Sequence, residues 1–173
     1  MDLIAAGAVA ADEIVAIFGK TEGNGCVNDF TRPLAVMALE TALAGAMGCT
    51  PAAVGARVAL VMSGGTEGGL SPHLLVLARR DGPEAEGASA LAIGTAFTAD
   101  FRPEAIGRTA QVRATAAAVG EAMVQAGLDT PEDVHFVQVK CPLLTSARIQ
   151  EAAERGETYV PEYDPELDDP ADL

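Results

Sequence analysis

Two lysines and a serine stand directly after apolar segments, where a side chain can reach a shared site. Lys20 follows EIVAIFG, Lys140 follows VHFVQV, and Ser63 follows RVALVM. Burial disfavours the ammonium form of lysine, and a neutral lysine can take a proton from a serine hydroxyl. One interpretation is therefore Ser–Lys chemistry, and the other is that each lysine faces solvent and simply ends its strand.

Ser63 also begins a turn with Gly64 and Gly65. Backbone N–H groups in such a turn can face a carbonyl oxygen or an oxyanion, and glycine permits the close approach of a ligand. An ordinary turn would carry the same residues. Glycine-rich loops also suggest a phosphate cradle, but neither GxxxxGK[ST] nor GxGxxG occurs in the sequence, which disfavours nucleotide binding.

Other polar side chains accompany these residues. Arg32 ends the loop before a predicted helix, and its planar guanidinium could hold carbonyl oxygens, although a surface arginine is the alternative. The tripeptide Thr-Glu-Gly occurs twice and places Glu22 and Glu67 beyond the candidate residues, either to orient the loops or as solvated charges. His73 and His135 lie in predicted strands and are interpreted as structural.

Apolar patterning predicts alternating strands and helices that would position these residues. The expected strands span residues 13–19, 57–62, 73–79, 91–97 and 134–139. The expected helices span residues 33–48, 51–54, 103–127 and 146–156, with Thr31 as a cap of the first and Gly127 ending the third. Residues 81–87 are expected to form a turn or loop. The pattern, rich in Ala, Val and Leu, predicts an α/β or α+β protein.

A weak repeat suggests that one structural unit is used more than once. An acidic turn, an apolar strand and a terminal lysine occur in the same order before Lys20 and before Lys140, 120 residues later. A period of domain size is typical of repeated units. Chance similarity of two strands is the alternative.

Composition excludes several classes of function. The 173 residues carry a formal net charge of −14, which provides no basic surface for nucleic acid. Cys26, Cys49 and Cys141 are widely separated, so no zinc site is expected. The sequence shows no signal peptide and no apolar run of membrane-spanning length, so a cytoplasmic protein without a membrane partner is expected.

Three strings carry a resemblance to a known family. GKTEGNGCVNDFTR (residues 19–32), VMSGGTEGGLSPH (61–73) and VHFVQVKCPLLT (134–145) resemble signature segments of the cyanuric acid hydrolase and barbiturase family. The resemblance runs from about residue 3 to about residue 156. It implies a fold of three α/β repeat units around a pseudo-threefold axis, of which about one and a half are present.

The resemblance also implies site residues and a reaction. Lys20 and Ser63 match the first unit's Ser–Lys pair, which polarises the substrate, and Arg32, Ser63 and Gly64 match substrate contacts. Lys140 matches the lysine of the second unit that activates the nucleophilic serine, and that serine would lie beyond residue 173. The implied reaction opens a small cyclic amide, such as cyanuric acid, to carboxybiuret and then biuret. Barbituric acid is the alternative substrate.

Residues 1–103 would form the first unit without its N-terminal strand, residues 104–156 the start of the second, and residues 157–173 a disordered acidic tail. No cofactor is expected, since the metal site of some members belongs to the third unit. The resemblance implies a hydrolase fragment, inactive alone or completed by another chain. A self-associating binding module without catalysis is the competing hypothesis, and a phosphate binder is a third.

Overall fold

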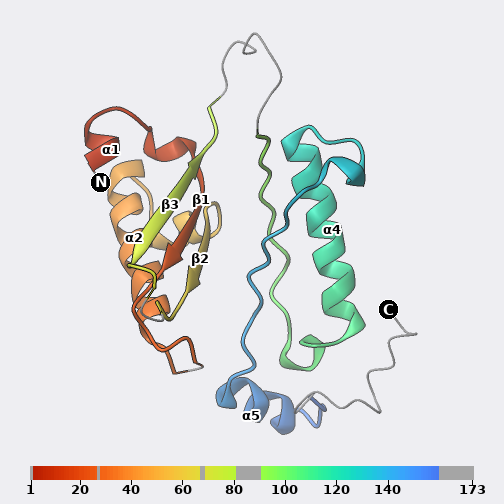
Figure 1. The fold of residues 1–173 in the computed structure, drawn as a ribbon. Helices are drawn as coiled ribbons and strands as arrows, with labels where there is room; N and C mark the ends of the chain where they lie inside the picture. Colours follow the sequence, from red (N-terminus) through yellow and green to blue (C-terminus); the bar gives the residue numbers. More distant parts are fainter. Residues whose placement is uncertain (1, 27, 67–68, 81–90, 160–173) are drawn as a thin grey trace. The chain divides into compact units, whose positions relative to one another are not determined.

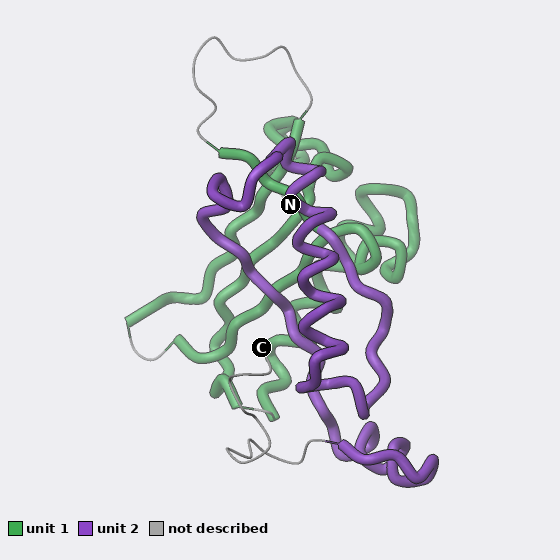
Figure 2. The backbone as a smooth tube through the Cα atoms, turned by 90° about the vertical axis from the view of Figure 1, so that its right-hand side faces the viewer, with its two compact units in different colours: residues 1–95 green, residues 96–173 purple. Residues whose placement is uncertain are grey.

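The computed structural model describes residues 2–26, 28–66, 69–80 and 91–159. Contacts within the chain divide it into two compact units, residues 1–95 and residues 96–173, coloured separately in Figure 2. Each unit is described by itself below. The predicted loop at 81–87, Glu67 and tail residues 160–173 lie outside the described residues.

A mixed three-stranded sheet forms the centre of the first unit (Figure 1). The strands β1 (Ile14–Lys20), β2 (Ala59–Ser63) and β3 (His73–Ala78) lie in the order β2-β1-β3. β1 runs parallel to β2 and antiparallel to β3. The short helix α1 (Asp2–Ala5) and the 3-10 turn η1 (Ala11–Glu13) precede the sheet.

Two helices connect the parallel strands β1 and β2, which cannot be joined by a tight turn. α2 covers Thr31–Met47 and α3 covers Pro51–Gly55. The hydroxyl of Thr50 accepts the backbone N–H of Ala53 at 3.2 Å, so a threonine cap and a proline in the first turn begin α3.

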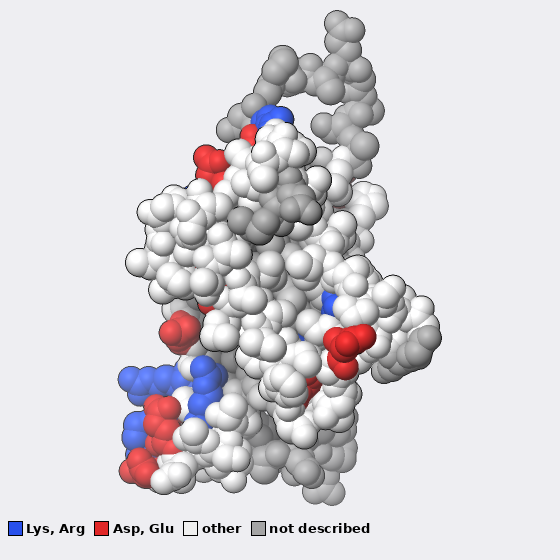
Figure 3. Space-filling model, turned by 90° about the vertical axis from the view of Figure 1, so that its left-hand side faces the viewer, with Lys and Arg blue, Asp and Glu red and all other residues white. Residues whose placement is uncertain are grey.

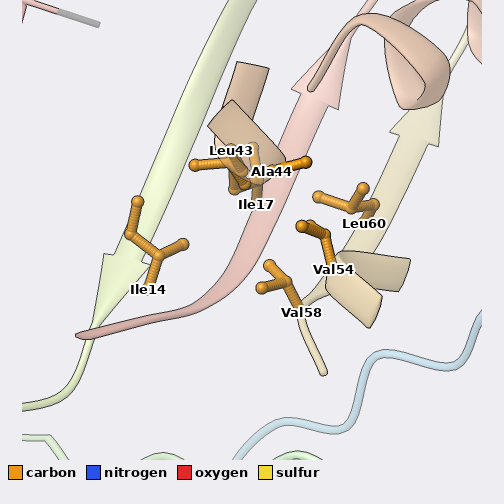
Figure 4. Packing of buried hydrophobic residues seen from close by; sticks show 7 residues of the cluster. All are labelled: Ile14, Ile17, Leu43, Ala44, Val54, Val58 and Leu60. Atoms are coloured by element: carbon orange, nitrogen blue, oxygen red, sulfur yellow. The ribbon is translucent and has the colours of Figure 1, made fainter. Parts of the chain in front are cut away.

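The core of the first unit lies between these helices and the sheet (Figure 4). Its buried members are Ile14, Ile17, Leu43, Ala44, Val54, Val58 and Leu60. They come from β1, α2, α3, β2 and the residue just before β2. Because one apolar cluster joins all of these elements, the core holds the ends of β1 and β2 in a fixed register.

The second unit contains the 3-10 turns η2 (Pro103–Ala105) and η3 (Pro131–Asp133) and two helices. α4 covers Thr109–Ala126, and α5 covers Ser146–Glu154. Arg155 donates to both carboxylate oxygens of Glu104, at 2.8 and 2.7 Å, and so joins the end of α5 to η2. A planar guanidinium on a carboxylate is a bidentate contact with defined geometry.

Most predicted elements of the first unit are confirmed, as is the mixed α and β class. The strands predicted at 13–19, 57–62 and 73–79 correspond to β1, β2 and β3 within a few residues, and the helices at 33–48 and 51–54 correspond to α2 and α3. The cap prediction is wrong: the structure makes Phe30 the residue before the helix, and the carboxylate of Asp29 accepts the Thr31 N–H at 3.0 Å. Asp29, two positions before Thr31, therefore provides the side-chain acceptor at the start of α2 that was predicted for Thr31.

The second unit departs further from prediction. Residues 91–97, which span the boundary between the two units, and residues 134–139 were predicted as strands, but the structure assigns neither segment to a strand ladder. A strand needs a neighbour for its backbone hydrogen bonds, and local sequence does not specify one. The predicted helix at 103–127 divides into η2 and α4, since Ile106 and Arg108 are extended around Gly107. Its predicted end at Gly127 and the helix α5 are confirmed.

The predicted boundary between the repeat units lies at 103/104, whereas the compact units of the structure divide the chain at 95/96. The repeat boundaries therefore stay a prediction.

Figure 3 shows the charged side chains on one face of the molecule. On the face drawn in Figure 3 most side chains are uncharged, and the basic ones at its lower left lie among acidic ones. A nucleic-acid site needs a continuous basic surface, which this face does not offer. Among the described residues, no helix combines the length and the apolar character needed to cross a bilayer.

Candidate functional site

Three polar side chains meet at one end of the sheet because the strand register brings them there. β1 ends at Lys20 and β2 ends at Ser63, and these two residues are paired in the parallel ladder. His73 begins the antiparallel strand β3 and is paired with Lys20 on the other side. The order across the sheet end is therefore Ser63, Lys20, His73.

The Lys20 amine contacts the predicted partner. Its Nζ lies 3.3 Å from Ser63 Oγ and 3.1 Å from the carbonyl oxygen of Gly64. Lys20 is half-buried, whereas Ser63 is exposed. An ammonium that donates to a serine oxygen leaves the hydroxyl hydrogen to be donated to a third group, such as a carbonyl of a bound molecule. The predicted grouping of Lys20, Ser63 and Gly64 thus exists as geometry.

A hydrogen-bonded loop supports this group. The Thr21 N–H donates to the Ser63 carbonyl oxygen at 2.9 Å, and the Thr21 hydroxyl lies 3.3 Å from the same oxygen. The Thr31 hydroxyl lies 2.9 Å from that of Thr21 and 2.5 Å from Asp29 Oδ1. Residues 21–31 are therefore connected to the end of β2 through two threonines.

Asp29 is the buried acid of the loop, with a side chain that is 0% exposed. Its Oδ2 accepts the Gly25 N–H at 2.9 Å, and its Oδ1 accepts from Thr31. The Thr31 hydroxyl, the N–H groups of Gly25 and Thr31 and the nearby Arg32 guanidinium lower the pKa of this carboxyl, while burial acts in the opposite direction. The carboxylate is thus stabilised as an anion inside the loop.

Arg32 contacts the same loop. Its guanidinium donates to the carbonyl oxygen of Cys26, and its Nε lies 3.9 Å from Asp29 Oδ2. These contacts fix the arginine against the loop that ends in α2. Its predicted contact with substrate stays a prediction.

Lys140 belongs to the second unit and is exposed, at the end of the extended segment 134–140. The Lys20 group belongs to the first unit, and the predicted role of Lys140 stays a prediction. His73 and His135 each place Nδ1 near the carbonyl oxygen two residues earlier, at 2.7 Å from Ser71 and 2.8 Å from Asp133. Glu22, the other predicted loop acid in the described part, is exposed.

An open pocket of about 410 Å³ borders Lys20. It lies on the β3 side of the lysine, against the first turns of α2, and is lined by Lys20, Thr21, Glu22, Thr31, Leu34, Ala35, Ala38, Pro72, His73 and Leu74. Ser63 stands on the opposite, β2 side. The pocket therefore borders Lys20 on the side away from Ser63.

Sequence reasoning missed Asp29, Thr21 and Thr31 as parts of the site. The available signal was an aspartate shortly before a helix that begins Thr-Arg-Pro, a typical capping pattern. Metal binding has no candidate within the described ranges, where no group of three or more His, Cys, Asp or Glu residues converges.

Comparison with known proteins identifies the family. The profile of the amidohydrolase ring-opening protein family matches residues 1–165. A cyanuric acid amidohydrolase of Azorhizobium caulinodans is 60% identical over 155 residues, which are 90% of this chain and 42% of that protein. A protein of the same name from Bradyrhizobium diazoefficiens is 55% identical over 159 residues, 90% of this chain and 43% of that protein.

A solved structure of a cyanuric acid hydrolase has the same fold, with a TM-score of 0.88 and 53% sequence identity. The match covers 95% of this chain and 46% of that one. The chain thus spans less than half the length of the relatives it matches. With the profile match over nearly all of its length, the chain belongs to the family of ring-opening amidohydrolases.

Proposed function

We propose that the chain forms part of a hydrolase that opens the ring of cyanuric acid, with Lys20 and Ser63 binding and polarising a ring carbonyl. The observation that carries the proposal is the 3.3 Å contact between Lys20 Nζ and Ser63 Oγ at paired strand ends. The names of the relatives favour cyanuric acid over barbituric acid as the substrate.

The polarising step follows from the direction of the hydrogen bonds. The Lys20 ammonium donates to Ser63 Oγ, and the Ser63 hydroxyl then donates to a carbonyl oxygen of the ring. Electron density drawn towards that oxygen makes the ring a better electrophile. In this role the pair needs no change of protonation during the reaction, and Arg32 and the Ser63–Gly64 turn supply further contacts to the ring.

The covalent step requires a second Ser–Lys pair. A serine oxygen attacks a ring carbonyl carbon, its proton passes to the lysine, and the ring C–N bond breaks as the nitrogen takes a proton. Water then hydrolyses the acyl-enzyme to carboxybiuret, which loses carbon dioxide to give biuret. We assign the lysine of this pair to Lys140 and its serine to the part of the relatives that this chain does not span. The proposed reaction uses no cofactor bound to this chain.

On this proposal the 173-residue chain alone does not turn over substrate. The test compares the pure chain with a mixture of the chain and the separately expressed remainder of the Azorhizobium relative. Biuret release only in the mixture, and its loss in Lys140→Ala, is the expected result. Turnover by the pure chain would contradict the assignment, and a fully active Lys140→Ala mixture would remove Lys140 from the chemistry.

A second candidate is a self-associating module that binds a ring without catalysis. The observation that favours it is the strand β3, which among the described residues pairs with β1 alone and exposes Leu74, Leu75 and Val76. Unpaired edges and apolar faces promote association. Light scattering separates the candidates: a stable trimer that binds cyanuric acid without turnover supports the module, and a monomer supports the hydrolase part.

A further inference from the structure

Asp29 is a buried carboxylate that the proposed reaction does not use, and it packs directly against the site. A Cβ placed on Gly64 would lie 1.8 Å from Asp29 Oδ2, and a Cβ placed on Gly23 would lie 1.8 Å from Oδ1. No side chain fits at such distances. The carboxylate therefore occupies the space between Gly23 and the turn after β2, and a side chain at either glycine would displace it from the hydrogen bonds that hold it.

The same carboxylate is linked to the Ser63 carbonyl, the other end of the Ser63–Gly64 peptide, through Thr31 and Thr21. An ionised carboxylate only accepts, so the single hydroxyl proton of Thr31 goes to Asp29 Oδ1 across 2.5 Å. With that proton committed, the Thr21 hydroxyl donates to the Thr31 hydroxyl oxygen at 2.9 Å, and the Thr21 backbone N–H donates to the Ser63 carbonyl oxygen at 2.9 Å. Asp29 thus acts on Gly64 by direct packing and on Ser63 through two threonines.

Lys20 completes the arrangement from the opposite side. Its amine donates to the Gly64 carbonyl oxygen at 3.1 Å as well as contacting Ser63 Oγ. The position of the Gly64 peptide therefore decides where the lysine amine is held relative to the serine. A shift of this peptide would move the amine and the hydroxyl apart.

We propose that Asp29 is a positioning residue that holds the Ser63–Gly64 peptide so that Lys20 and Ser63 form one binding group for a cyclic amide. The identity of the ligand rests on the proposed function above, but the positioning itself does not. A carboxylate that served only as the cap of α2 would not be packed against a residue 35 positions later in the sequence, Gly64.

The first experiment follows the backbone amides of the full chain by NMR. Asp29→Asn keeps the shape but turns an acceptor into an amide donor facing the Gly25 N–H, and Asp12→Asn is the control on an exposed acid of the same unit. We expect Asp29→Asn to shift the signals of Ser63, Gly64 and Gly65 and to speed their hydrogen exchange, with the core of α2 unchanged. Effects confined to residues 23–32 would overturn the proposal, because they would make Asp29 a helix cap alone.

A double-mutant cycle tests the packing if Asp29→Asn is poorly folded. Gly64→Ala forces a methyl group onto the carboxylate, and Asp29→Ala removes this obstacle while leaving the Gly25 Cα at 3.0 Å in both backgrounds. We expect Gly64→Ala to lower the melting temperature far less in the Asp29→Ala background than in the wild type. Equal losses in both backgrounds would show that the two residues are not coupled and would overturn the proposal.

Ligand binding separates positioning from general stability. Cyanuric acid affinity, measured by calorimetry, is expected to fall about tenfold or more, or roughly 1.4 kcal/mol, in Asp29→Asn. Thr31→Val, which cuts the hydroxyl link and keeps the shape, should also weaken binding, and Asp12→Asn should bind like the wild type. Unchanged affinity in both site variants overturns the proposal. If the wild type binds no cyanuric acid, the proposed function fails, and the amide signals and the cycle still decide the role of Asp29.

Discussion

At the level of single residues, the proposed binding role of Ser63 depends on where its hydroxyl hydrogen points. Because Lys20 donates to Ser63 Oγ, the serine hydroxyl is directed to donate elsewhere. Ser63 is exposed, so this donor is within reach of a ligand. The half-buried lysine therefore orients and polarises an exposed, neutral hydroxyl, which can donate to a ligand at the surface.

Ser63→Ala tests this role. It removes the donor while leaving the strand and the Gly64 contact of Lys20 in place. We expect cyanuric acid to bind about tenfold more weakly, because a hydrogen bond of this kind contributes about 1.5 kcal/mol. Calorimetry with the full chain measures the change, and Ser146→Ala, at the start of α5, is the matched control. An affinity equal to that of the control would exclude Ser63 from the site.

The contact between Lys20 and Ser63 was expected from the family resemblance and from their places after apolar segments, and the contact between Asp29 and Gly64 was not. Both former residues end strands, and parallel strands that end together place their last side chains side by side. The packing of Asp29 against Gly64 depends instead on a long-range approach of two loops. Neither loop has a periodic pattern from which this contact could be predicted, so it becomes visible only in the three-dimensional fold.

At the level of elements, a charged contact joins the entry to the sheet with its exit. Arg80, just after β3, donates to both carboxylate oxygens of Glu13 at 2.5 and 2.8 Å, and the Ala10 N–H donates to Glu13 Oε2 at 3.0 Å. The Arg80 hydrogen bonds first, and then the Ala10 N–H, lower the pKa of Glu13 from 4.5 to about 2.

This shift predicts a pH dependence of stability. The unfolded chain protonates Glu13 near pH 4.5 and the folded chain only near pH 2, so the contribution is complete above 4.5 and is lost as the pH falls towards 2. Glu13→Gln should lower the melting temperature at pH 7 and flatten its decline between pH 4.5 and 2. Circular dichroism melts across this range measure both effects.

Glu104 provides the matched comparison in the second unit, where Arg155 lowers its pKa to about 2 by hydrogen bonding. Glu104→Gln should reduce the fall of the melting temperature between pH 4.5 and 2 that remains in Glu13→Gln. The double variant should show the smallest fall. An acid slope in Glu13→Gln identical to that of the wild type would show that the Arg80 contact does not persist in solution.

The core of the first unit rests on few large side chains. Ile17 is 2% exposed at the centre of β1, among residues of α2, α3 and β2. Ile17→Ala should reduce the free energy of unfolding by about 2–5 kcal/mol through lost burial and a cavity. Urea unfolding measures this loss, and Leu3→Ala, at an exposed position, should change stability by no more than about 0.5 kcal/mol. A loss for Ile17→Ala as small as that of the control would contradict the observed core.

The elements differ in how well sequence predicts them. β1 and α2 have strong apolar patterns and clear ends, and both were predicted nearly to the residue. Residues 91–97 and 134–139 have equally apolar patterns, yet the structure shows no ladder for them. An apolar pattern indicates that a segment is suited to a strand. The pairing of that segment depends on a neighbouring strand, which can lie anywhere in the chain or in another chain.

At the level of the whole molecule, two apolar segments that form no strand ladder, residues 91–97 and 134–139, can be set beside the part of the relatives that this chain does not span. Phe136 is 72% exposed and Leu91 is 75% exposed, which is unusual for large apolar side chains in predicted strands. The chain covers 42% of the Azorhizobium relative. If the remainder of that relative supplies strand partners, these segments would gain a strand ladder and an apolar cover when the two parts combine.

Hydrogen exchange tests this completion directly. In the chain alone, the amides of residues 134–140 should exchange rapidly, because they have no ladder partner among the described residues. Adding the remainder of the relative should slow their exchange by at least about tenfold, since a paired strand opens only at a cost in free energy. The amides of α2, already protected by their own helix, should not change and serve as the internal control. Activity restored without protection at 134–140 would mean that Lys140 works from an unpaired segment, and the strand prediction would then be wrong for the assembled protein as well.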